Sequence, residues 1–167
     1  MTDLNSIFGD LDVDEIGDDP FGIANGTYWA VVTDAKISEK DGNYALTFQW
    51  QIDEPGNEYN ANKVSEFYPI YPGKKNSDLD ADELKRMKFL KRRMRRGFGM
   101  SEGEMKSLKP QNLIGKFAYI TVVNNPAKDN SGRIYINVTE ALTKDLYDEE
   151  VGAREENISQ GAASLGL

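Results

Sequence analysis

The sequence predicts a small all-β domain with one long helix, in the order β-β-β-α-β-β. Three observations lead to this prediction. Several stretches rich in β-branched and aromatic residues alternate in hydrophobicity with a period of two. Strong turn signals separate them, above all Lys40-Asp41-Gly42-Asn43, since Asp-Gly tolerates the positive φ angles of a tight hairpin. Residues 80–96 instead carry apolar side chains three or four positions apart, which is the period of an amphipathic helix.

Two turns separate the first three predicted strands. Residues 27–38 are rich in Thr, Tyr, Trp, Val and Ile, which favour a pleated surface. Residues 44–52 alternate most clearly, and a third strand is expected over residues 63–71. The face predicted to be apolar in the second strand consists of Tyr44, Leu46, Phe48, Trp50 and Ile52.

The long helix is followed by a short helix and two more strands. Asp78 or Asp80 is expected to cap the long helix, and Gly97 and Gly99 are expected to end it. The sequence then predicts a short helix up to Leu108, strands over residues 116–125 and 134–143, and a hairpin loop over 128–133. The core-facing stripe of the long helix is Leu84, Met87, Leu90 and Met94, continued by Phe98.

This order and length are those of the five-stranded OB barrel, an all-β barrel with one helix between strands three and four. We therefore expect three regions. Residues 1–22 form an acidic N-terminal arm, residues 23–145 form the OB-fold domain, and residues 146–167 form an acidic, then Gly/Ala/Ser-rich disordered tail.

Composition excludes several classes of site. The chain of 167 residues has no cysteine and no histidine, which excludes disulfides, thiolate zinc sites and a Ser-His-Asp triad. No apolar run approaches the roughly 20 residues of a membrane span, and no signal peptide is visible, so we expect a cytoplasmic protein without membrane contact.

The net charge of −8 conceals an uneven distribution. Residues 1–20 hold seven acids and no base, and residues 140–167 hold seven acids and two bases. The remaining segment has 14 acids and 18 bases, so a mildly basic body lies between acidic ends.

OB barrels bind ligands across strands two and three, flanked by the loops that here are residues 39–43 and 124–133. These elements combine cations, which suit phosphates, with rings that can stack on unpaired bases. In the other interpretation, Phe67 or Tyr68 fills the core. The candidates in these elements are Lys40, Lys63, Phe67, Tyr68, Tyr71, Lys74, Lys75, Lys128 and Arg133.

The long helix supplies a second group of candidates. Residues 85–96 contain eight bases and no acid, and Phe89 lies opposite the apolar stripe, within the basic face. This face either extends a nucleic-acid path, holds the acidic arm, binds another partner, or is simply solvated. The candidates are Phe89, Arg92, Arg93 and Arg96.

The acidic ends admit three interpretations. They solubilise the protein as disordered segments, they bind replication or recombination proteins, or they compete with DNA for the basic surface as phosphate mimics.

The ordered pattern resembles that of small phage-encoded single-stranded-DNA-binding proteins of the OB type, over about residues 26–145. The resemblance rests on Gly26-Thr27-Tyr28, Lys40-Asp41-Gly42-Asn43-Tyr44, Lys63-Val64-Ser65-Glu66-Phe67, Arg95-Arg96-Gly97-Phe98-Gly99 and Leu113-Ile114-Gly115-Lys116. It implies a role in bacteriophage DNA replication or recombination, in the host cytoplasm, with binding largely independent of base sequence.

We therefore expect a non-catalytic single-stranded DNA-binding protein without cofactor, metal or catalytic residues. The alternative is an OB-fold protein-interaction or structural phage component that does not bind nucleic acid. A carboxylate metal site at residues 78–83 is less favoured, because acids at a helix start are explained by capping and by the helix dipole. The sequence leaves open the oligomeric state and the preference between DNA and RNA.

Overall fold

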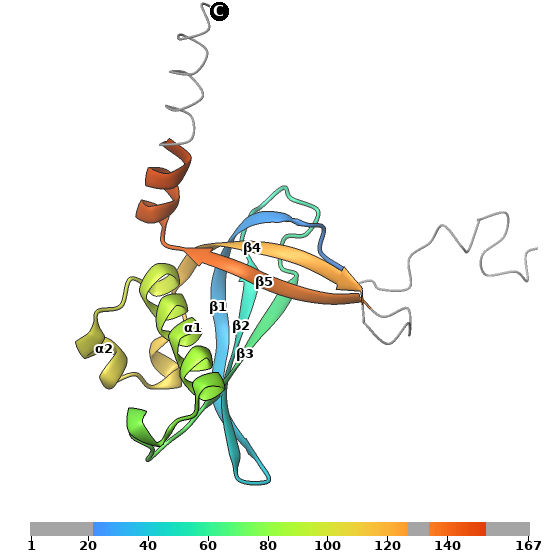
Figure 1. Cartoon of the computed structure of the whole chain (residues 1–167). Coiled ribbons are helices and arrows are strands. Elements are labelled where there is room, and N and C mark those ends of the chain that lie inside the picture. Colours follow the sequence, from blue (N-terminus) through green and yellow to red (C-terminus); the bar gives the residue numbers. More distant parts are fainter. Residues whose placement is uncertain (1–21, 127–133, 153–167) are drawn as a thin grey trace, which may run out of the picture.

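The computed structural model describes residues 22–126 and 134–152 (Figure 1). Five antiparallel strands form one sheet in the order β3-β2-β1-β4-β5, which confirms the predicted five-stranded β-rich fold with a long helix between the third and fourth strands. The strands are β1 (Gly26–Lys40), β2 (Asn43–Ile52), β3 (Lys63–Ile70), β4 (Phe117–Pro126) and β5 (Ile134–Leu142). The helices between β3 and β4 are α1 (Ala81–Phe98) and α2 (Glu102–Lys106), each preceded or followed by a short 3₁₀ turn, Asn76–Asp78 and Pro110–Asn112.

The β1–β2 hairpin forms where the sequence predicts it. Asp41 and Gly42 have φ angles of 53° and 79°, so both central turn residues adopt the left-handed conformation that a two-residue hairpin needs. The alternation in β2 is confirmed for Leu46, Phe48, Trp50 and Ile52, whose side chains are all buried. Tyr44, predicted on the same face, is 37% exposed because it lies near the hairpin end, beyond the core.

Helix α1 packs against β3, β4 and β5 (Figure 1). Its Asp80 N-cap accepts a hydrogen bond from the Glu83 amide at 2.8 Å, and Gly99 ends it in the left-handed conformation. Phe98 is buried and stacks on Trp50, with ring centroids 5.3 Å apart and planes 2° from parallel. Gly97, also expected to end the helix, lies inside it. Glycine at this position allows the helix to approach β5 closely, because a Cβ there would lie 3.0 Å from the Cβ of Ala141.

The sheet is not closed into a barrel, so the expectation of a closed OB barrel was wrong in this respect. Strands β3 and β5 are the two edges of the sheet, and no backbone ladder joins them in the described ranges. The guanidinium of Arg93 reaches from α1 into this seam, where it pairs with Glu66 of β3 and donates to the Val138 carbonyl of β5 at 3.1 Å. A side chain thus bridges the two edges where a closed barrel would have backbone hydrogen bonds.

The expected disordered tail is contradicted over its first residues. Residues 144–152 are helical, so the expectation of disorder from residue 146 was wrong for residues 146–152. Thr143 starts this helix, and the Tyr147 ring stacks on Tyr119 of β4 at a centroid distance of 3.9 Å. Ring stacking on the sheet provides the tertiary contact that the acidic composition of the segment did not suggest. The arm up to residue 21 and the tail from residue 153 lie outside the described residues.

Candidate nucleic-acid interface

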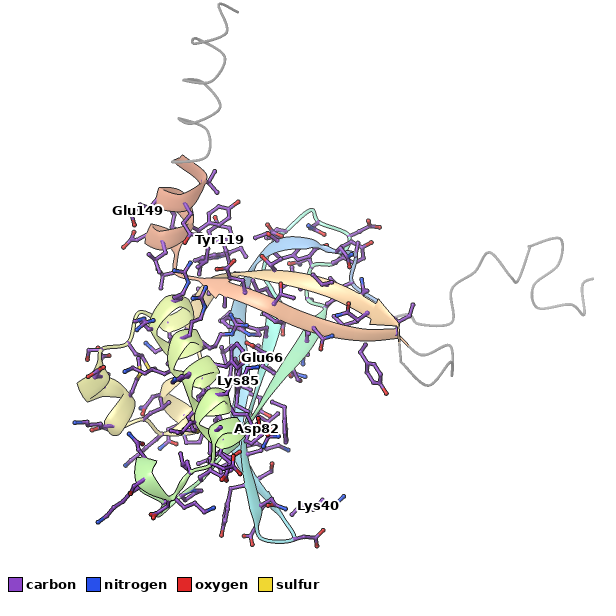
Figure 2. All side chains as sticks on the ribbon, viewed as in Figure 1. Lys40, Glu66, Asp82, Lys85, Tyr119 and Glu149 are labelled. Atoms are coloured by element: carbon purple, nitrogen blue, oxygen red, sulfur yellow. The ribbon has the colours of Figure 1, made fainter. Side chains whose placement is uncertain are left out.

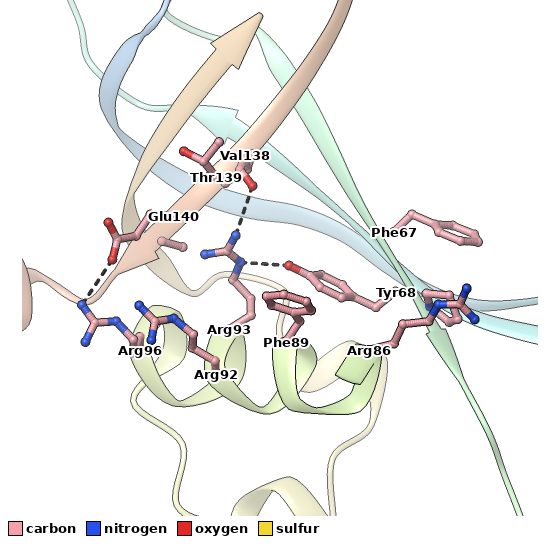
Figure 3. Close-up of a pocket in the computed structure, with 12 residues that line it drawn as sticks. Phe67, Tyr68, Arg86, Phe89, Arg92, Arg93, Arg96, Val138, Thr139 and Glu140 are labelled. Carbon is pink, nitrogen blue, oxygen red and sulfur yellow. Dashed lines mark hydrogen bonds and ion pairs between the residues drawn. The ribbon is translucent and has the colours of Figure 1, made fainter. Parts of the chain in front are cut away.

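A groove of about 490 Å³ lies between α1, β3 and β5 (Figure 3). It brings together all four candidates of the long helix with two of those on the third strand. Its lining residues are Phe67, Tyr68, Pro69, Arg86, Phe89, Arg92, Arg93, Arg96, Val138, Thr139, Glu140 and Ala141.

Two phenylalanine rings of this groove are open to solvent. Phe67 is 66% exposed on β3, and Phe89 is 56% exposed on α1, opposite the buried Leu90 and Met94 face. The interpretation that Phe67 fills the core is therefore wrong. Exposed rings of this size do nothing for the core, and they offer flat surfaces on which planar groups can stack.

Tyr68 and Arg93 belong to a buried polar cluster centred on Glu66. One Glu66 oxygen accepts from the Tyr68 hydroxyl at 2.6 Å and from Arg93 Nε at 2.8 Å, while the other accepts from Trp50 Nε1 at 2.7 Å. Arg93 Nε also lies 3.0 Å from the Tyr68 hydroxyl, and Figure 3 shows Arg93 between Tyr68 and Val138. The two side chains thus line the groove while being held by partners within the fold.

The pKa values in this cluster reflect its burial. Burial, followed by the charge of the Glu66 carboxylate, raises the pKa of the Tyr68 hydroxyl. Burial alone would lower the pKa of Arg93, but the carboxylate of Glu66 and the hydroxyl of Tyr68 outweigh that effect and raise it. The cluster therefore holds a neutral tyrosine beside a charged, paired arginine over the ordinary pH range.

Arg96 closes one end of the groove and is also engaged. It pairs with Glu140 of β5 at 3.2 Å and with Glu150 of the 144–152 helix. Hydrogen bonding to Glu150, more than the opposing effect of burial, raises the pKa of Arg96. Two carboxylates around one guanidinium leave this end of the groove without free positive charge.

Arg86 and Arg92 are the exposed cations of the groove. Arg86 donates to the Tyr71 hydroxyl at 3.2 Å, and neither arginine forms an ion pair with a residue that the structure describes. Arg86 was not among the site residues predicted from the sequence. Its place in the basic run, three positions before Phe89 and so on the same helix face, was the signal that could have identified it.

A second hollow of about 990 Å³ adjoins the first between the β1–β2 hairpin, the end of β3 and the start of α1. The two share Phe67, Pro69 and Arg86, and we call the combined surface the α1–β3 groove. The second hollow adds three predicted residues, Lys40, Tyr71 and Lys74, together with Tyr44, which the alternation of residues 44–52 placed on the apolar face of the strand.

The remaining predicted cations differ in availability. Lys40 is exposed near the hairpin tip (Figure 2), whereas Lys74 pairs with Glu83 at 3.5 Å and lies 5.7 Å from the Tyr71 ring centre. Lys63 and Lys75 are exposed but line neither hollow. Lys128 and Arg133 lie outside the described residues.

A row of rings on the outer face of β1 and β4 was not predicted. Trp29 stacks on Phe117 at 5.5 Å and contacts Tyr119 at 4.7 Å between ring centres. Because Tyr147 covers Tyr119, this row anchors the 144–152 helix. The alternation of residues 117, 119 and 121 was the available signal, but it does not say which side of the sheet receives the helix.

The acids at the start of α1 serve as caps. The Asp78 carboxylate accepts from the Lys75 amide at 3.0 Å, Asp80 caps α1, and Glu83 pairs with Lys74. Within residues 22–126 and 134–152, no three acidic side chains are grouped so as to hold a metal ion. In the same residues, no helix has the length and apolarity needed to cross a membrane.

Comparison with known proteins identifies no family: no protein-family model matches the chain, and no curated protein matches it significantly.

Proposed function

We propose that this chain is a non-catalytic protein that binds single-stranded DNA in the α1–β3 groove, largely independently of base sequence. The observation that carries the proposal is the grouping of two exposed rings, Phe67 and Phe89, with Arg86 and Arg92, which have no ion-pair partner in the described residues. Unpaired bases present π-faces of every sequence to such rings, and cations beside the rings contact the phosphates. Duplex DNA keeps its bases stacked and so cannot use the rings.

Strand order and resemblance extend the proposal. The order β3-β2-β1-β4-β5, with edges β3 and β5 bridged through Arg93, is compatible with an OB-type barrel opened along one seam. The resemblance of residues 26–145 to phage single-stranded-DNA-binding proteins supports a role in bacteriophage DNA replication or recombination in the host cytoplasm. We include this biological role in the proposal.

The first test is titration of a fluorescent oligothymidylate with wild type and with Phe67→Ala and Phe89→Ala. Each substitution should weaken binding by about 1–3 kcal/mol, or roughly 5- to 150-fold in Kd, because one base loses its stacking partner. The matched control is Ile114→Ala, which removes an apolar side chain that is 47% exposed and lines neither hollow. Thermal melting should be nearly unchanged for all three variants, since none of the side chains is buried.

The second test concerns the phosphates. Arg86→Gln and Arg92→Gln should each lower the slope of log K against log salt by about 0.7, the value for one phosphate contact on a single strand. Wild-type protein that fails to bind at low salt would refute the proposal. If none of the four groove substitutions changed the Kd or the salt slope, the assignment of the site would be refuted.

A further inference from the structure

Helix α1 carries more positive charge than the fold uses. Of its eight bases, four have partners: Lys91 pairs with Glu102 at 2.6 Å, Arg93 with Glu66, Arg96 with Glu140 and Glu150, and Arg86 donates to Tyr71. The other four are exposed and form no ion pair within the described part of the chain. We call them the α1 stripe: Lys85, Lys88, Arg92 and Arg95.

The spacing of the α1 stripe places its members in one line. Positions i, i+3, i+7 and i+10 of a helix fall within about 80° of arc and extend over about 15 Å of its axis. Lys91, bound to α2, lies on one side of this line, and Phe89 with the groove lies on the other. Lys85, labelled on α1 in Figure 2, is exposed like the other three members. The stripe is thus a continuous cationic edge beside the groove.

Helix stability does not explain this arrangement. Like charges three and four positions apart repel and weaken a helix. The helix dipole favours cations only in the last turn, where Arg95 lies, whereas Lys85 and Lys88 occupy the N-terminal half of Ala81–Phe98. A chain with 28 acids and 20 bases nevertheless places no acid among residues 85–96. Such uncompensated charge is typical of a surface that binds a linear polyanion.

We infer that the α1 stripe binds the phosphate backbone of the DNA strand where it leaves the groove, so that the bound length exceeds what the groove alone holds. The inference rests on the proposed function. Arg92 connects the two parts, because it lines the groove and also belongs to the stripe. Positive charge alone would suit either a DNA backbone or an acidic protein segment, but the continuity through Arg92 favours the backbone of the strand that is already bound in the groove.

The test uses the triple variant K85Q/K88Q/R95Q of the full chain, which leaves every groove residue intact. Glutamine retains good helix propensity, and removal of like charges should leave the melting temperature unchanged or raised. The matched control is K106Q/K109Q/K116Q, which removes the same number of charges from residues outside α1 and outside the groove. Kd is measured for oligothymidylates from about 4 to about 20 nucleotides, a range that spans the known site sizes of OB folds.

The inference predicts a length-dependent effect. On the shortest oligonucleotides the triple variant should bind within about twofold of wild type. On the longest, its salt slope should fall by about 2 and its affinity by roughly 100-fold near 0.1 M salt, because three contacts of about 0.7 each are lost. The control should follow wild type at every length.

Four outcomes count against the inference. If wild type binds and the triple variant binds equally well at every length, the inference is overturned but the proposed function stands. Equal weakening at all lengths, or equal weakening by the control, overturns it as well, since the effect is then one of general charge. Wild type that binds no oligothymidylate at low salt overturns the proposed function and this inference with it.

Discussion

Breaking the buried ion pair between Arg93 and Glu66 should be among the most destabilising changes available in α1. The Arg93 side chain is 10% exposed and that of Glu66 is 5% exposed, so removing one partner leaves the other as a buried charge with neither a counter-ion nor water to stabilise it. Arg93→Met should therefore lower the free energy of unfolding by about 3–5 kcal/mol, which includes the lost hydrogen bond to the Val138 carbonyl. Glu66→Gln should fall at the low end of this range, because its amide oxygen can still accept from Trp50 Nε1.

The double variant distinguishes a coupled pair from two independent losses. If the charges compensate one another, E66Q/R93M should lose little more than Arg93→Met alone, giving a coupling free energy of about 2–3 kcal/mol. Urea unfolding followed by tryptophan fluorescence measures all three variants, and Trp50 within the cluster contributes to this signal together with Trp29.

Lys91→Met provides the control. It breaks an ion pair of similar length on the same helix, but with side chains 48% and 74% exposed, so the stability should hardly change. If Arg93→Met proved no more harmful than Lys91→Met, or if the double variant lost the sum of both single effects, the argument that Arg93 holds the β3–β5 seam would be refuted.

Two further predictions concern pH and packing. Because the pKa of Tyr68 is raised, the folded protein keeps this proton above pH 10.0, whereas the unfolded chain loses it. The free energy of unfolding should therefore fall as the pH rises past 10, by at most about 1.4 kcal/mol per pH unit from this group. Tyr68→Phe should make that fall shallower in urea titrations between pH 9 and 11, and an unchanged dependence on pH would contradict the assignment. Gly97→Leu should destabilise the protein by roughly 1–3 kcal/mol in the same assay, because a Cβ at position 97 would lie only 3.0 Å from that of Ala141. Gly103→Leu is the control and should not destabilise the protein, because a Cβ there would meet only Ser101 Oγ, at 3.9 Å. Equal effects of the two substitutions would show that α1 can move away from β5 without loss of stability.

Local pattern predicted the elements well. The hairpin at Asp41-Gly42 and most of the predicted apolar faces of β2 and α1 depend on interactions between residues close in sequence, and they appear where they were expected. The ends of these faces differ, because Tyr44 is exposed and Leu84 is not buried. The exposed position of Phe89 was also readable from helical periodicity, because a residue opposite a buried stripe must face away from the core.

Long-range packing decided which candidate side chains are available as a site. Sequence alone could not distinguish Arg92, which is exposed, from Arg93, which is buried one position later, because the difference depends on Glu66 from β3 and Val138 from β5. The same applies to Arg96, whose partners Glu140 and Glu150 are more than forty residues away.

What the sequence determined by itself was the order of strands and helices, the basic character of α1 and the exposure of Phe89. The tertiary structure alone decided that the sheet stays open between β3 and β5, that residues 144–152 fold onto β4, and which cations remain unpaired beside the groove. The physical reason is that periodicity reports which face of an element is buried, whereas the partner of a buried charge is chosen by chain segments that meet only after folding.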